Sequence, residues 1–329
     1  MNPHITVTNL QKTYRVPIRP EGLRASVQSL FNRRYDSVQA VCGVNFTIQP
    51  GEMVGLIGPN GAGKTTTLKM LSGLLYPSSG DARIDGFIPW ERKPQYLRRI
   101  SMVMGNKSQL LWDIPPLDSF RVLGEIYNVP PSEYRQTLDE LIELLEMQEL
   151  LNKPVRNLSL GERMKCELTA ALLYRPSVMF LDEPTLGLDV SMQLRLRQFL
   201  AEYNRRSGVT VLLTSHYMAD VTALCPRVIL IHHGKLLYDG ALVELSQKLA
   251  PFKLLKVTLR GEPNGFEQGL PPGSAVVEHG PDHITLRIPR DSAPAATAHL
   301  LNTLPVADLT VEDPPIEVVI DQVYSEGGV

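Results

Sequence analysis

The sequence has no long hydrophobic run, little cysteine and almost no net charge. No apolar stretch approaches the roughly 18 residues that a membrane-spanning helix requires. The opening residues, Met1 to His4, lack the pattern of a secretory signal peptide. We therefore expect a chain that neither crosses a membrane nor enters a secretory route by itself.

Cysteine and charge each exclude a class of site. Cys42, Cys166 and Cys225 are odd in number, far apart and without metal-ligand spacing. This favours buried small hydrophobic side chains over disulfides or a zinc site, and it indicates a reducing, cytoplasmic compartment. The formal net charge of −2 gives no electrostatic footprint for nucleic acid, so no nucleic-acid partner is expected.

A glycine-rich loop is the clearest chemical signal. Residues 58–65 read Gly-Pro-Asn-Gly-Ala-Gly-Lys-Thr, between an apolar strand at 53–57 and an amphipathic helix. Glycines let the backbone wrap around phosphate oxygens, and its N–H groups and the helix N-terminus supply positive potential. This predicts a nucleoside triphosphate site in which Lys64 meets the β- and γ-phosphates and Thr65 ligates Mg²⁺. The predicted nucleotide contacts are Gly58, Pro59, Asn60, Gly61, Ala62, Gly63, Lys64, Thr65 and Thr66.

Polar residues follow two further predicted strands. The strands at 177–181, 209–214 and 227–231 alternate with helical patterns, which predicts an α/β parallel sheet. Ligands in such sheets bind outside the carboxyl ends of the strands. There, Asp182 can hold Mg²⁺ and Glu183 can orient and deprotonate an attacking water. His216, after the next strand, can hydrogen-bond the γ-phosphate and sense its loss.

The segment from Leu158 to Glu162 opens a helix through a capping box, Ser159 with Glu162. It also resembles the LSGGQ signature of ATP-binding-cassette (ABC) proteins, a resemblance that covers residues 5 to about 245. The phosphate loop, Leu181-Asp182-Glu183-Pro184, the D-loop-like Gly187-Leu188-Asp189 and His216 as the switch histidine all contribute to it.

The resemblance implies further site residues. The signature residues Ser159, Leu160, Gly161 and Glu162 would face the γ-phosphate bound to the opposite subunit, Asp189 would belong to the D-loop, and Tyr14 would stack on adenine. Leu160 and Glu162 depart from the family's Gly and Gln, and Glu162 adds negative charge near phosphate. Asn106 falls at the Q-loop glutamine position by spacing, with Gln109 three residues later. Which of the two meets Mg²⁺ is left open, with Asn106 favoured.

The implied fold is an α/β P-loop NTPase cassette with a mostly parallel sheet, an antiparallel β subdomain and a helical subdomain at about 88–175. We assign residues 1–245 to this nucleotide-binding domain. Beyond Leu249 the chain becomes proline-rich and its hydrophobic period changes to two. Residues 250–329 are therefore predicted to form a small α+β accessory domain. Its few aromatic residues favour dimerisation or regulation over a ligand-binding platform.

Residues 21–35 are predicted to form an inserted amphipathic helix. Leu23, Val27, Leu30 and Phe31 recur at helical spacing, with Arg24, Arg33 and Arg34 as cationic heads. Such a helix suits the inner leaflet of a membrane or a partner protein. Packing on its own domain explains the pattern equally well.

Within the family, the sequence around the signature and His216 looks most like ATPase subunits of ABC-2 type exporters, which include drug and natural-product efflux systems. This implies a subunit that binds ATP and Mg²⁺, forms a homodimer or a heterodimer, and drives a separate transmembrane permease from the cytoplasmic face of the membrane. An importer ATPase stays open as an alternative. A soluble cassette acting on ribosomes or DNA is less favoured, because the chain has one cassette and no coiled-coil tract between Lys64 and Ser159.

Overall fold

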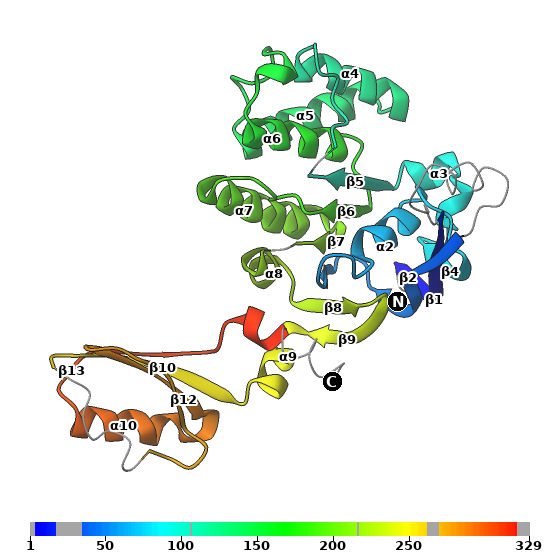
Figure 1. Ribbon diagram of the computed structural model, residues 1–329. Coiled ribbons are helices and arrows are strands. Elements are labelled where there is room, and N and C mark those ends of the chain that lie inside the picture. Colours follow the sequence, from blue (N-terminus) through cyan, green and yellow to red (C-terminus); the bar gives the residue numbers. More distant parts are fainter. Residues whose placement is uncertain (1–3, 18–34, 106, 216, 262–269, 321–329) are drawn as a thin grey trace, which may run out of the picture. The chain divides into compact units, whose positions relative to one another are not determined.

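The computed structural model describes residues 4–17, 35–105, 107–215, 217–261 and 270–320 of the chain. The chain divides into two compact units, Met1–Gly240 and Ala241–Val329 (Figure 1). Each unit has its own hydrophobic core, and each is described by itself.

A six-stranded sheet in the order β5-β6-β7-β3-β8-β9 organises the first unit. Neighbours from β5 to β8 pair in parallel, and these strands succeed one another through the unit in Figure 1. Nearly every residue of β3, β6, β7 and β8 is buried, as expected for a parallel sheet covered on both faces. The strands are β3 (Met53–Ile57), β5 (Ile100–Met104), β6 (Val178–Asp182), β7 (Thr210–Thr214), β8 (Arg227–His232) and β9 (Lys235–Ala241).

The helical subdomain is smaller than predicted. The range 88–175 contains β5, which pairs with β6 from Ile100 opposite Val178 to Met104 opposite Asp182. The apolar residues of β5 are thus needed in the sheet. Among the described residues, no helix is long and apolar enough to cross a membrane. The α-helices of this unit are α2 (Lys64–Leu71), α3 (Pro94–Leu97), α4 (Pro116–Tyr127), α5 (Pro131–Leu145), α6 (Leu160–Leu172), α7 (Val190–Ser207) and α8 (Met218–Leu224).

An antiparallel sheet in the order β2-β1-β4 completes the first unit. Its strands are β1 (Ile5–Pro17), β2 (Tyr35–Ile48) and β4 (Ser79–Ile84). The expectation that Tyr35 ends a helix is wrong, because Tyr35 is the first residue of β2 and pairs with Pro17. The rest of the predicted helix, 21–34, lies outside the described residues. The pairing brings Pro17 and Tyr35, which flank residues 18–34, side by side.

The second unit is a four-stranded antiparallel sheet in the order β11-β12-β10-β13. The buried residues of β10 alternate along the strand, which confirms the period of two there. Leu255 of β10 and Leu286 of β12 pack in one hydrophobic cluster with Leu300 of α10. The elements are α9 (Leu242–Leu249), β10 (Phe252–Leu259), β11 (Ala275–His279), β12 (His283–Pro289), α10 (Ala293–Thr303) and β13 (Val306–Glu312). Residues 316–320 are helical.

Candidate functional site

The phosphate loop joins the buried strand β3 to α2, and two of its glycines occupy positions where a Cβ atom would clash with backbone atoms. A Cβ atom on Gly58 would lie 2.2 Å from the Ile231 carbonyl oxygen. Gly63, the residue before α2, has a φ of 110° and would place a Cβ 2.4 Å from the Ala40 carbonyl oxygen. The sequence therefore folds into a tight backbone loop with the N-terminus of α2 at its end.

Lys64 lies within this loop. Its side-chain Nζ donates hydrogen bonds to the carbonyl oxygens of Gly58 (2.6 Å) and Pro59 (3.1 Å). Burial lowers the pKa of Lys64, while the nearby carboxylates of Glu183 and Asp182 act in the opposite direction. An ammonium group held beside the loop backbone can pair with phosphate oxygens.

Asp182, at the end of β6, accepts hydrogen bonds from hydroxyl groups on two other elements. Its Oδ1 accepts hydrogen bonds from Thr65 Oγ1 on α2 (3.1 Å) and from Thr214 Oγ1 at the end of β7 (2.7 Å). Carboxylate and hydroxyl oxygens are the hard ligands that Mg²⁺ prefers. Thr65 and Asp182, already in contact, therefore fit a site for a magnesium–nucleotide complex.

Glu183 has a backbone conformation that glutamate rarely adopts. Its φ is 54°, a left-handed conformation that costs a non-glycine residue roughly 1–2 kcal/mol. Its N–H group donates to the backbone oxygen of Thr214 at 3.0 Å and lies 3.2 Å from the Thr214 hydroxyl. Pro184 further disfavours a right-handed helical Glu183. The hydrogen bonds to Thr214, at the end of β7, thus keep Glu183 in its strained conformation, and this conformation fixes the direction of its carboxylate.

These residues line one cavity of about 260 Å³. Thr65 and Lys69 come from α2, Asp182 and Glu183 from the end of β6, and Gly105 and Lys107 from the segment after β5. The carboxyl ends of neighbouring strands thus meet the phosphate loop at one edge of the sheet, as the sequence predicts. Such a cavity can bind a polyphosphate and place a carboxylate beside it.

The segment after β5 bears on the choice between Asn106 and Gln109. Gly105 and Lys107 line the cavity, whereas the side chain of Gln109 donates to the Met102 carbonyl oxygen at 3.3 Å. Asn106 itself lies outside the described residues. The choice between the two residues therefore stays a prediction.

The capping box at the start of α6 is confirmed. The Ser159 side chain accepts from the Glu162 N–H group, and the Glu162 carboxylate accepts from the Ser159 N–H group at 2.8 Å. These hydrogen bonds lower the pKa of Glu162, first through the Ser159 backbone. The negative charge of Glu162 therefore neutralises a helix end rather than projecting freely from it.

The signature packs against the start of α7. A Cβ on Gly161 would lie 3.0 Å from the Met192 side chain, and one on Gly187 would lie 3.1 Å from Leu160. Asp189 is the N-cap of α7, accepting from the Met192 N–H group at 3.0 Å. The Leu160 that replaces the family's glycine thus fills space beside the D-loop-like turn.

Two predicted site residues are less defined by their surroundings. Tyr14 lies on β1 with 37% of its surface exposed, and the Lys12 ammonium lies 5.3 Å from the centre of its ring. His216 lies outside the described residues, although its neighbour Ser215 is buried.

Sequence reasoning missed Asp220, a fully buried carboxylate on α8. It accepts hydrogen bonds from Thr185 Oγ1 and from Ser215 Oγ (2.7 Å), and it forms an ion pair with Arg197 of α7 at 2.8 Å. It therefore joins the segments that follow the acidic pair and β7. One signal in the sequence was available, because Asp220 lies one helical turn after the Ser-His dipeptide.

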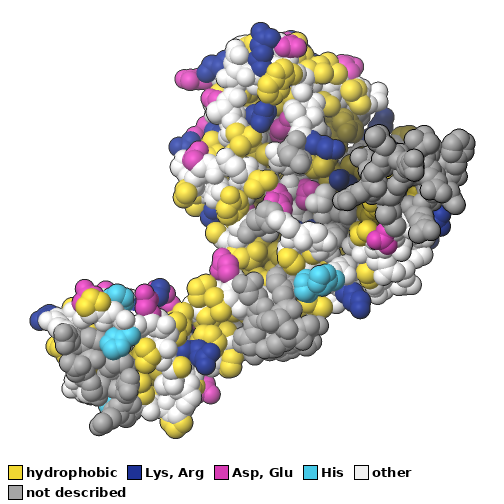
Figure 2. Space-filling view, viewed as in Figure 1, with side chains coloured by type: hydrophobic (Ala, Val, Ile, Leu, Met, Phe, Trp, Pro, Cys, Tyr) yellow, Lys and Arg dark blue, Asp and Glu magenta, His cyan; other side chains and the backbone are white. Residues whose placement is uncertain are grey.

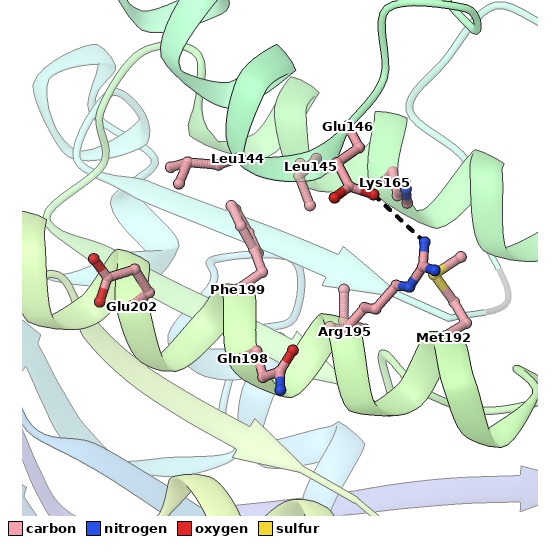
Figure 3. A pocket seen from close by; sticks show the side chains of 10 residues that line it. Leu144, Leu145, Glu146, Lys165, Met192, Arg195, Gln198, Phe199 and Glu202 are labelled. Carbon is pink, nitrogen blue, oxygen red and sulfur yellow. Dashed lines mark hydrogen bonds and ion pairs between the residues drawn. The ribbon is translucent and has the colours of Figure 1, made fainter.

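A larger cavity of about 400 Å³ lies between α5, α6 and α7 (Figure 3). Leu145, Leu196 and Phe199 form apolar wall, and Arg195 pairs with Glu146 at 3.5 Å across it. None of the predicted site residues lines this cavity. Its size alone does not mark it as the chemical site.

Two family models match the chain. Residues 41–186 match the family described as "ABC transporter", and residues 251–312 match the "EvrA-like ABC transporter, C-terminal domain". The first match includes the phosphate loop, the signature and the acidic pair. The second covers all four strands of the antiparallel sheet in the second unit.

Several bacterial proteins are similar in sequence. The ABC transporter ATP-binding protein NatA of Bacillus subtilis is 35% identical over 215 residues, covering 65% of this chain and 87% of NatA. The linearmycin resistance ATP-binding protein LnrL of the same organism is 27% identical over 87% of this chain and 93% of LnrL. The Nod factor export ATP-binding protein I of Burkholderia thailandensis is 36% identical, covering 64% of this chain and 68% of that protein.

Solved structures share the fold. An ATP-binding subunit of an ABC transporter superposes with a TM-score of 0.61 at 25% identity, covering 74% of this chain and 92% of that subunit. A dimeric post-hydrolysis structure of the cassette MJ0796, bound to ADP and phosphate, has a TM-score of 0.58 at 24% identity, covering 72% of this chain and 98% of that cassette.

We expect Asp220→Asn to destabilise the chain strongly, because it leaves the partly buried Arg197 without a compensating charge. Breaking a buried ion pair in this way typically costs about 3–5 kcal/mol. Denaturant unfolding measures the loss. Asp118→Asn, which removes an exposed pair with Arg121, is the matched control and should have a much smaller effect. Equal unfolding midpoints for the two variants would contradict the role of Asp220.

Proposed function

This chain belongs to the family of ABC transporter ATP-binding proteins, and from that premise we propose that it drives export through a separate membrane permease. The observation that carries the proposal is the cavity where the phosphate loop, Asp182 and Glu183 meet. Two relatives support the direction, since their names specify Nod factor export and linearmycin resistance. The permease belongs to the ABC-2 type in this proposal.

Hydrolysis follows from the positions of the side chains. The loop backbone, the N-terminus of α2 and Lys64 bind the phosphates and stabilise their negative charge. Glu183, held by Thr214, orients a water for attack on the γ-phosphate and takes its proton. His216, two residues after Thr214, hydrogen-bonds the γ-phosphate. The strained backbone of Glu183 keeps the base aimed at the cavity.

Magnesium is the metal that the site fits. Thr65 and Asp182 would hold it, with Asn106 as the further ligand and Gln109 as the alternative. When bound, Mg²⁺ would neutralise charge on the β- and γ-phosphates. Within the described ranges, no group of three or more Asp, Glu, His or Cys side chains is placed to hold a metal ion.

A homodimer would complete the site. ABC cassettes act as dimers with transmembrane partners, and one polypeptide here carries both the phosphate loop and the signature. Ser159 to Glu162 at the N-terminus of α6 would then face the nucleotide of the partner subunit, with Asp189 beside them and adenine stacked on Tyr14. We assign the second unit to dimer stabilisation or regulation.

The helical subdomain offers a surface for the permease. Val122 and Ile126 lie one turn apart on α4 with 46% and 63% of their surfaces exposed, and Leu111 and Trp112 are half-exposed nearby in sequence. Apolar side chains reach the surface over this subdomain in Figure 2. Exposed apolar groups of this kind are typical of a partner interface. Docking there would place the chain at the cytoplasmic face of the membrane.

The first test of catalysis is Glu183→Gln. The amide keeps the shape of the side chain but removes the base, so ATP binding should persist while turnover falls about 10²- to 10⁴-fold. Steady-state ATP hydrolysis and equilibrium ATP binding measure the two effects. Glu202→Gln, an exposed carboxylate change on α7, is the control. Turnover within a few-fold of the parent in Glu183→Gln would remove Glu183 from the role.

Composite sites predict complementation between two inactive chains. Lys64→Ala damages the phosphate loop and Ser159→Arg damages the signature. A mixed dimer should regain one site free of both changes, and with it up to about half of the parental activity per dimer. ATPase assays of the mixture and of each variant alone measure this. A mixture no more active than its components would contradict signature action in trans.

The proposed permease interface is tested by Val122→Glu combined with Ile126→Glu. The chain should lose copurification with the permease from its native membrane, because two charges enter an apolar interface. Val243→Glu, an equally exposed change in the second unit, should retain it. Circular dichroism verifies folding. Copurification undiminished by the α4 changes would show that the permease binds elsewhere, and recovery of an importer permease would overturn the export proposal.

Residues 21–35 are proposed to touch anionic lipid through Arg24, Arg33 and Arg34. Each positive charge near such a surface contributes about 1 kcal/mol to the free energy of membrane binding, and the contribution falls as the salt concentration rises. Replacing the three arginines by Gln should reduce ATPase activity and transport by the complex in anionic liposomes, but not the ATPase activity of the isolated chain. Equal loss in both preparations would instead assign the segment to the stability of its own domain.

A further inference from the structure

The segment that follows β5 separates two cavities. Lys107 lines the cavity of about 260 Å³ that contains Asp182 and Glu183. It also lines a second cavity of about 240 Å³ on the side of α6, together with Arg163 and Glu167. Because there is space on both sides of Lys107, the polar contacts of its neighbours contribute to the position of this segment.

Glu167 of α6 supplies those contacts. It is buried, with 3% of its surface exposed. Its carboxylate accepts a hydrogen bond from the Ser108 hydroxyl and lies 2.9 and 3.1 Å from the Gln109 backbone nitrogen. Burial raises the pKa of Glu167, whereas its hydrogen bonds from residues 108–110 and the charge of Arg163 act in the opposite direction. A buried carboxylate needs such donors. The hydrogen bonds to Glu167 therefore stabilise the contact between α6 and the segment after β5.

The other end of the segment is attached to the acidic pair. The Gly105 N–H group donates to the Asp182 carbonyl oxygen at 3.0 Å. A Cβ on Gly105 would lie only 2.5 Å from the Glu183 carbonyl oxygen, so the backbones are in close contact there. One face of the segment is therefore fixed to the residues that carry the chemistry, and Glu167 fixes it to the helix that begins with the signature.

We propose that Glu167 is a positioning residue that couples the signature helix α6 to the wall of the phosphate cavity. A movement of α6 would pull on Ser108 and Gln109 and so shift Lys107 and Gly105 against Asp182 and Glu183. Glu167 lies two turns from Ser159, in the same rigid helix. This inference rests on the proposed function, because it concerns how one chain adjusts its own hydrolytic site.

Trp112 provides a reporter of the segment. It is half-exposed, and the Arg163 guanidinium lies 5.5 Å from its ring centre. The chain has two tryptophans, so Trp90→Phe leaves Trp112 as the single emitter. In this background, Glu167→Gln replaces the carboxylate, which accepts several hydrogen bonds, by a neutral amide of the same shape. Glu140→Gln, which removes an exposed ion pair with Arg175, is the matched control.

In the full-length chain carrying Trp90→Phe, a non-hydrolysable ATP analogue with Mg²⁺ should change the Trp112 emission. Glu167→Gln should abolish that change and lower kcat about tenfold, the effect of about one charge-assisted hydrogen bond. Nucleotide affinity should stay within about twofold. Glu140→Gln should match the Trp90→Phe chain in all three measurements. A merely structural role would lower affinity, emission change and kcat together, and that result would overturn the proposal.

Two further outcomes are decisive. Parental kcat and emission change in Glu167→Gln would overturn the coupling while leaving ATP hydrolysis established for the parent. If Glu167→Gln does not fold, Ser108→Ala removes one donor from the same carboxylate. It should lower kcat about threefold with an unchanged thermal midpoint, and parental kcat there would also overturn the proposal. A parent that neither binds nor hydrolyses ATP would contradict the proposed function itself.

Discussion

The site depends on the position of one carboxylate. Asp182 ends β6 and accepts hydrogen bonds from Thr65 on α2 and from Thr214 at the end of β7. The parallel register places Asp182 directly opposite Thr214, and the phosphate loop follows β3, which is the next strand after β7. These contacts therefore define where a metal–nucleotide complex can bind. Glu183 takes its strained conformation from the same Thr214, so base and metal ligand share one support.

The chemistry of this edge could be predicted from the sequence because it is local. The glycine spacing in 58–65 dictates a tight loop, and acidic and polar residues directly follow apolar strands that must lie side by side in a parallel sheet. The capping box at Ser159 is likewise decided within four residues. In the second unit, the period of two is enough to predict that the chain forms strands.

The remaining features could not be predicted, because they depend on partners far apart in the chain. β5 is short and follows a helical turn, and only its pairing with β6 shows that it belongs to the sheet. Tyr35 begins a strand because Pro17 lies opposite it. Asp220 and Glu167 look in sequence like solvated helical acids, yet both are buried. Each is compensated by donors from loops that no helical periodicity reveals.

The buried carboxylates also indicate how the subdomains communicate. Asp220 joins the segments after the acidic pair and β7 to α7, while Glu167 joins the segment after β5 to α6. α7 begins at Asp189 and packs its first turn against Gly161 of the signature. The residues of the proposed phosphate site are thus connected to both helices by charged, desolvated contacts, which are sensitive to small displacements.

In the proposed site, Thr65 and Asp182 hold a divalent metal together with bound nucleotide. Mn²⁺ binding to the purified chain, followed by electron paramagnetic resonance with a non-hydrolysable ATP analogue, tests this arrangement directly. We expect Mn²⁺ binding that requires the nucleotide and is lost in Thr65→Ala and in Asp182→Asn. Nucleotide-dependent Mn²⁺ binding that survives both substitutions would contradict it.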